Sequence, residues 1–145
     1  MKTSDLTRYI RSSRATCCDA DTLKALIRAE IDLNQSDMLG FTPLMLAAFR
    51  GRTDIVKALI VAGVDIDKSN GCEQTALTLA NSCDTALALI SAGADINKRG
   101  VARLESPLIR TVRNRKYQIS EALIKAGANM NIVDCNGMTA LMHAA

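Results

Sequence analysis

Short apolar segments alternate with polar, turn-forming stretches along most of the chain. The segment at 44–48 is apolar throughout, and it directly follows Thr42 and Pro43. A threonine side chain can cap the first turn of a helix, and proline suits the first helical position, where the backbone donor has no partner. A second apolar segment begins near Asp54 and stops at Gly63, a residue that suits the left-handed position just beyond a helix. The pattern predicts two short helices joined by a tight turn.

Both ends of this helix pair recur along the chain. The opening Thr-Pro-Leu at 42–44 aligns with Thr-Ala-Leu at 75–77, Ser-Pro-Leu at 106–108 and Thr-Ala-Leu at 139–141. A closing phrase, in which Ala-Gly precedes two Asp or Asn residues, recurs at 62–67, 92–97 and 126–131. Successive openings are 33, 31 and 33 residues apart. The chain is therefore expected to repeat one structural unit.

A period near 33 residues with an opening similar to Thr-Pro-Leu-His-x-Ala is typical of ankyrin repeats. On these two motifs, residues 37–145 resemble the ankyrin-repeat family. The resemblance implies an all-α fold, an α-solenoid of stacked helix-turn-helix units with short β-turn or hairpin fingers. It also implies a protein–protein interaction module or scaffold.

We expect residues 1–145 to form a single ankyrin-repeat domain with five units. These are an N-terminal capping helix pair at 1–36, a repeat at 37–69, a shortened repeat at 70–98, a repeat at 99–133 and an incomplete final repeat at 134–145. The shortened repeat lacks three residues between its helices, so its first helix should end early and Asp84 should cap the second. The final unit stops after one helix. We interpret the chain as a fragment, although a partner or a second copy could also cover that end.

The same alignment of repeats shows where glycines are replaced, and it predicts the core residues. Glu73 and Leu104 stand where the first full repeat has the finger glycine Gly40, and Arg115 stands where it has Gly51 between the helices. The apolar positions predict a core of Leu44, Leu46, Ala47, Val56, Leu59, Ile60, Leu108, Ile119, Leu123 and Ile124.

Composition limits the possible chemistry. Aromatic residues are only 3% of the chain, which suits the stacking of small-residue helices. The five cysteines form no C-x-x-C pair, and no signal peptide or transmembrane run is present, so we expect reduced thiols in a cytoplasmic protein. His143 is the single histidine, and we interpret it as structural. We expect no metal, no cofactor, no membrane association and no catalytic site.

Candidate partner-binding residues lie where the family builds its concave face, from the finger tips and the exposed side of the first helices. Carried over position by position, they are Met38, Leu39, Phe41, Phe49, Arg50, Gln74, Arg103, Arg113, Asn114 and Met138. Exposed aromatics flanked by arginine are typical of interface anchors. Alternatively, Phe41 or Phe49 packs within the solenoid and stabilises the finger.

The third repeat concentrates positive charge, and its cations have three interpretations. They are Lys98, Arg99, Arg103, Arg110, Arg113, Arg115 and Lys116. They could form a solvated face, meet a partner protein with an acidic surface, or bind nucleic-acid phosphates. Nucleic acid is the least favoured, because almost no aromatic residue accompanies these cations to stack on bases. As an alternative to a different partner, the chain could form a homodimer through its open C-terminal end.

Overall fold

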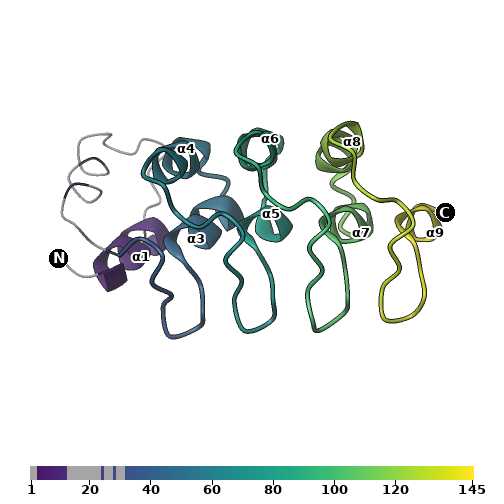
Figure 1. The fold of residues 1–145 in the computed structure, drawn as a ribbon, viewed down its shortest axis with the longest axis horizontal. Coiled ribbons are helices and arrows are strands. Elements are labelled where there is room, and N and C mark those ends of the chain that lie inside the picture. Colours follow the sequence, from purple (N-terminus) through teal and green to yellow (C-terminus); the bar gives the residue numbers. More distant parts are fainter. Residues whose placement is uncertain (1–2, 13–23, 25–27, 29–31) are drawn as a thin grey trace.

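Helices separated by long loops stack side by side along the molecule (Figure 1). A computed structural model describes residues 3–12, 24, 28 and 32–145 of the chain. Within them the helices are α1 (Thr3–Ser12), α3 (Pro43–Phe49), α4 (Thr53–Val61), α5 (Ala76–Leu79), α6 (Cys83–Ser91), α7 (Pro107–Arg113), α8 (Tyr117–Lys125) and α9 (Ala140–Ala144). The second helix expected in the capping unit lies outside the described residues except for Lys24 and Arg28, which are helical and exposed.

The helices form two layers (Figure 1). The outer helices α4, α6 and α8 lie in one layer, and the inner helices α3, α5, α7 and α9 lie in the other, in line with α1. The loop before each inner helix, here called a finger, extends away from both layers. Inner helices contact their neighbours in the sequence α1, α3, α5, α7, α9, and outer helices do so in the sequence α4, α6, α8. This arrangement confirms the predicted all-α ankyrin solenoid.

Each inner helix begins at a side-chain cap. Pro43 and Pro107 occupy the first turn of α3 and α7, as the repeat openings predicted. A hydroxyl at each opening satisfies a backbone N–H that has no partner within the helix, and so fixes where the finger ends. The capping oxygen accepts a hydrogen bond in the pairs Thr42–Met45 (3.2 Å), Thr75–Thr78 (3.4 Å), Ser106–Ile109 (3.3 Å) and Thr139–Met142 (3.3 Å).

The shortened repeat has a single-turn inner helix, since α5 spans only four residues. The early end of this helix was predicted correctly, but the predicted cap of the next helix was wrong. Ser82 caps α6, because its Oγ accepts a hydrogen bond from the N–H of Thr85 at 3.2 Å. Asp84 is instead the second residue of α6. A cap needs an extended backbone, and Ser82 has it, with φ −129° and ψ 153°.

Three non-glycine residues adopt the turn conformation that glycine adopts in the first full repeat. Gly40 and Gly51 have φ of 81° and 66°. At the aligned positions Glu73 and Leu104 have φ of 53° and 52°, and Arg115 has φ of 58°. The left-handed conformation costs a non-glycine residue roughly 1–2 kcal/mol. The surrounding repeat therefore holds these turns against the preference of their own residues.

The core fills the space between the two layers, and most of its predicted members are fully buried. Ile60 is half-buried and packs against the core. Ile124 was predicted wrongly, since 47% of it is exposed. It follows the buried Leu123 directly and therefore points about 100° further around α8. No described outer helix lies beyond α8 to cover that side. The correctly predicted residues are Leu44, Leu46, Ala47, Val56, Leu59, Leu108, Ile119 and Leu123.

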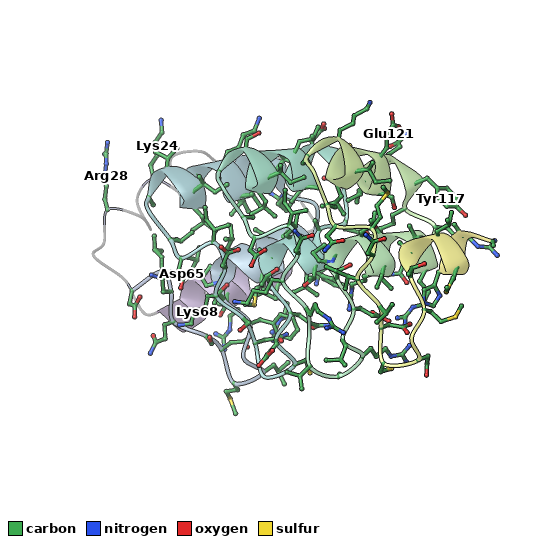
Figure 2. The ribbon with its side chains drawn as sticks, turned by 45° about the vertical axis from the view of Figure 1, so that its right-hand side comes forward. Lys24, Arg28, Asp65, Lys68, Tyr117 and Glu121 are labelled. Atoms are coloured by element: carbon green, nitrogen blue, oxygen red, sulfur yellow. The ribbon has the colours of Figure 1, made fainter. Side chains whose placement is uncertain are left out.

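The closing phrases connect successive units through a ladder of hydrogen bonds. Each bond runs from a backbone N–H of one unit to a side-chain oxygen of the unit before it. The pairs are Asp65 N to Asn34 Oδ1 (2.7 Å), Asp95 N to Asp67 Oδ1 (2.8 Å) and Asn129 N to Asn97 Oδ1 (2.8 Å). Lys68 adds a bond from its Nζ to the carbonyl of Asn34, and Figure 2 shows Lys68 close to Asp65. These bonds keep adjacent units in register.

Candidate binding surface

Three of the four fingers are held in shape by one carboxylate or amide side chain. Its Oδ1 accepts two backbone N–H groups of the same finger, which rigidifies the turn. Asp37 accepts from Leu39 and Phe41, Asn70 accepts from Cys72 and Gln74, and Asp134 accepts from Asn136 and Met138, all at 2.8–3.0 Å. In the third finger Arg99 has a comparable role, because it donates to the carbonyls of Leu104 and Val133 at 3.0 and 2.7 Å. These hydrogen bonds therefore hold the backbone of each finger in one conformation.

The first finger and the end of α3 carry the most exposed of the predicted binding residues. Met38 and Leu39 at the finger tip are 103% and 67% exposed, and Phe49 at the end of α3 is 53% exposed. Arg50 is exposed next to it, and its Nη2 donates to the carbonyl of Arg11 at 3.0 Å. These residues place apolar surface and positive charge in water on the inner-helix side.

The two phenylalanines differ, and this separates the two interpretations of the sequence. Phe41 is half-buried and packs against the core, while its N–H bonds to Asp37. It stabilises the first finger and presents only part of its ring to a partner. Phe49 is the more exposed of the two rings, at 53%.

Three further predicted residues, Gln74, Asn114 and Met138, lie at separate places. Gln74 is half-buried, and its Oε1 accepts a hydrogen bond from Asn70 Nδ2 at 3.1 Å. Asn114 is exposed at the C-terminal cap of α7. Met138 is half-buried in the last finger. The structure therefore does not gather all predicted residues into one patch.

A pocket between the second and third fingers does bring several of them together. It encloses about 230 Å³, and its lining includes Thr78 of α5. Arg110, which the sequence placed only in the general basic cluster, completes the cationic wall. Its spacing of three residues from Arg113 on one helix was the available signal, because such residues share a face. The lining residues are Cys72, Gln74, Thr78, Gly100, Ala102, Arg103, Glu105, Arg110 and Arg113.

The pocket holds three guanidinium groups and one carboxylate. Glu105 is buried, and it forms an ion pair with Arg113. Partial burial lowers the pKa of Arg110, the nearby Glu105 carboxylate opposes that shift, and the charges of Arg113 and Arg103 add to it. The guanidinium groups therefore repel one another here, and Glu105 only partly compensates.

The seven cations of the third repeat do not form one surface. Lys98 donates from Nζ to the carbonyl of Asp67 at 2.6 Å, and Lys116 donates to the carbonyl of Ala80 at 3.3 Å. Burial, with a smaller effect from Arg110, lowers the pKa of Lys116. Arg99 supports the third finger, and Arg115 occupies the exposed turn before α8. Only Arg103, Arg110 and Arg113 face a common space.

A second hollow lies on the opposite side, between the outer helices α4 and α6. It encloses about 690 Å³ and is lined largely by apolar groups, among them Ile60, Val61 and Leu87. Val61 is 88% exposed and Leu87 is 45% exposed. The sequence pattern predicted no binding feature on this side. Figure 2 shows Tyr117 and Glu121 of α8 pointing away from the body of the solenoid.

His143 has a structural partner. Its Nε2 lies 2.8 Å from Asp134 Oδ2, and so links α9 to the finger that precedes it. Hydrogen bonds from the Met138 N–H and from His143 lower the pKa of Asp134. Among the described residues, no three His, Cys, Asp or Glu side chains come together as metal ligands would. None of the described helices combines the length and apolar character needed to cross a membrane.

Comparison with known proteins identifies the repeat. A family model of ankyrin repeats (3 copies) matches residues 13–100. The ankyrin repeat protein FPV244 of fowlpox virus (strain NVSL) is 30% identical over 122 residues, which cover 82% of this chain and 18% of the viral protein. Oxysterol-binding protein-related protein 1 of Rattus norvegicus is 35% identical over 96 residues, which cover 66% of this chain and 10% of that protein.

A third relative shows the same coverage pattern. Neurogenic locus notch homolog protein 1 of Mus musculus is 34% identical over 116 residues, or 77% of this chain and 4% of that protein. The chain thus spans less than a fifth of the length of each of these three relatives. The family match covers more than half of the chain, and it agrees with the stacked helix pairs and their fingers. The chain belongs to the ankyrin-repeat family.

Proposed function

We propose that this domain binds a partner protein through its inner-helix and finger side. Ankyrin repeats are in general protein–protein interaction modules. The observation that carries the proposal is the exposure of Met38, Leu39 and Phe49 on this side. Apolar surface in water costs about 25 cal/mol per Å², and a partner that covers it recovers that free energy. Phe49 beside Arg50 has the composition of an interface anchor.

The proposed role is a scaffold and not an enzyme. The histidine that could act as a base is bonded to Asp134 and ties a finger to its helix. The arginines of the pocket bind anions well but do not exchange protons near neutral pH. The domain would comprise residues 1–145, and its five units would have the boundaries that the sequence repeat predicts. The exposed free thiols of Cys72 and Cys135 favour a reducing compartment such as the cytoplasm.

The test compares two apolar surfaces of one domain. Proteins captured on the wild-type chain from a lysate are identified, purified singly and titrated with the chain by calorimetry. We expect the Leu39→Ala/Phe49→Ala variant to lose about tenfold or more in affinity, because truncated anchors commonly cost over 1 kcal/mol. Val61→Ala removes an exposed apolar side chain from the outer helices and should leave the affinity unchanged. The reverse result would move the site to the groove between α4 and α6.

A second candidate is self-association through the C-terminal end. Leu141 and Met142 of α9 are 78% and 53% exposed, and Ile124 of α8 is 47% exposed. Two copies that pair across this face would bury these side chains. Light scattering at rising concentration should then show a dimer for wild type and a monomer for Leu141→Ser/Met142→Ser. A wild-type chain that stays monomeric at 1 mM or so, where even weak specific contacts are populated, rules this candidate out.

A further inference from the structure

We propose that the pocket between the second and third fingers receives an acidic side chain, an aspartate or glutamate, from an extended segment of the partner protein. This inference rests on the proposed function, because it names the chemistry that the finger side would recognise. It assigns the pocket formed by Gln74, Arg103, Glu105, Arg110 and Arg113 as the site.

The charge of the pocket is unbalanced. Three guanidinium groups face it, whereas Glu105 is the single carboxylate among its lining residues. That carboxylate is already engaged by Arg113. The lining therefore carries two positive charges in excess, and a carboxylate from outside would reduce the repulsion between the arginines.

The pocket also offers free hydrogen-bond donors to a ligand. A guanidinium group has five N–H donors in a planar fork that matches the two oxygens of a carboxylate. The side chains of Arg99, Lys98 and Lys116 donate hydrogen bonds to backbone carbonyls of the solenoid. Among the described residues, by contrast, no acceptor receives a hydrogen bond from the side chain of Arg103 or Arg110. These two arginines are thus available to a ligand.

The size and the lining of the pocket limit what it can hold. About 230 Å³ is less than the roughly 300–1,000 Å³ of pockets that enclose drug-sized ligands, so a single amino-acid side chain fits better than a larger group. The lining includes no aromatic ring on which a base could stack, and Tyr117 lies on the outer helix α8. Single-stranded nucleic acid is therefore a poor fit.

The test uses the complete chain and short peptides of defined composition. The probe is an acetylated and amidated Gly-Ser-Glu-Glu-Ser-Gly, with Gly-Ser-Gln-Gln-Ser-Gly as the neutral control and a peptide with two phosphoserines in place of the glutamates as the competing chemistry. Binding is followed by NMR through the Nε–Hε signals of the arginines. We expect the Glu peptide to shift the signals of Arg103 and Arg110 but not that of Arg99. Equal shifts with the Gln peptide, or shifts with the phosphopeptide alone, would overturn the proposal.

Two substitutions that each remove one positive charge distinguish peptide binding in the pocket from attraction to the basic surface in general. Arg110→Gln should weaken Glu-peptide binding about tenfold or more, because one partner of a desolvated charge pair is lost. Arg115→Gln removes the same charge from an exposed turn outside the pocket and should change affinity less than twofold. If circular dichroism shows that Arg110→Gln is misfolded, Arg103→Gln in the exposed third finger takes its place. Equal losses for the pocket variant and Arg115→Gln would mean that net charge alone attracts the peptide.

The same variants distinguish this inference from the function on which it rests. A captured partner that is lost with Leu39→Ala/Phe49→Ala, yet is bound normally by both Arg110→Gln and Arg103→Gln, keeps the protein-binding function and refutes the acidic contact. If neither set of variants changes the binding of any purified partner, both the protein-binding function of this side and the acidic contact are refuted.

Discussion

The side-chain oxygen of Asn97 accepts a hydrogen bond from the backbone N–H of Asn129, one unit further along, at 2.8 Å. Equivalent bonds join the two preceding unit boundaries. Asn97→Ala should therefore lower the free energy of unfolding by about 1 kcal/mol, the net value of one such hydrogen bond. Urea denaturation followed by circular dichroism measures it.

Asn131 supplies the matched control for this prediction. It occupies the same place in its own closing phrase, but its side chain receives no N–H from a further unit among the described residues. Asn131→Ala should change stability by less than about 0.5 kcal/mol, as is usual for surface substitutions. If both variants lose equal stability, the effect lies within each turn and the ladder between units contributes nothing.

Ser82, and not Asp84, caps the outer helix of the shortened repeat. Ser82→Ala removes the oxygen that accepts the Thr85 N–H, and we expect a loss of about 1 kcal/mol. Asp84→Ala removes only a favourable charge from the first turn of α6, which is worth about 0.3–1 kcal/mol at an exposed site. Thermal unfolding of the two variants should rank Ser82→Ala as the less stable. The opposite ranking would restore Asp84 as the residue that starts this helix.

Gly63 has φ of 80°, and no heavy atom lies within 4 Å of the place where a Cβ would stand. Gly63→Val should still destabilise by about 1 kcal/mol or more, because the left-handed backbone disfavours a β-branched residue. Gly71 offers the control: the space around its Cβ position is also free, but its φ lies outside the left-handed range. Gly71→Val should leave the melting temperature nearly unchanged. A Gly63→Val chain as stable as wild type would contradict the strained turn.

Arg115 provides the reverse test, because a non-glycine residue already occupies a left-handed turn there, with φ of 58°. Arg115→Gly relieves a conformational cost of roughly 1–2 kcal/mol in the folded state. The greater freedom of glycine in the unfolded chain opposes this gain by about 0.5–1 kcal/mol. The net expectation is a small rise in the free energy of unfolding. A fall in stability would show that the Arg115 side chain makes a stabilising contact worth more than the strain.

Asp134 should give the domain a specific sensitivity to acid. Hydrogen bonds from the Met138 N–H and from His143 hold its pKa below the ordinary aspartate value, about 3.9 in an unfolded chain. Its ionised form therefore stabilises the fold fully above about pH 4, and this contribution is lost as the pH falls through the lowered pKa. Urea denaturation between pH 6 and pH 2.5 measures the loss.

Asp134→Asn keeps an oxygen for the finger N–H groups but removes the charge. Its stability should fall less steeply below pH 4 than that of wild type. Parallel curves for wild type and Asp134→Asn would show that this carboxylate does not contribute to the acid sensitivity.

Local signals in the sequence were enough to predict the helices and turns. Thr42 and Pro43 mark a helix start, Gly63 marks a helix end, and both act within one or two turns of chain. The repetition of these signals then predicted the stacking. Local reasoning was wrong at Asp84, where two neighbouring residues can each cap a helix and only the backbone conformation decides between them. It was also wrong at Ile124, since burial there depends on whether another helix covers α8.

The sequence by itself thus determined the architecture of this protein, because ankyrin units are specified by short-range capping and turn chemistry that each unit repeats. Only the tertiary structure decided which of its cations meet. Arg103 and Arg110 face one pocket with Glu105 and Arg113, whereas Lys98 and Lys116 are used to hold the solenoid together. Tertiary packing also decided that Phe41 supports a finger while Phe49 stays exposed. These outcomes depend on contacts between residues of neighbouring units, and the pattern along a single unit does not specify such contacts.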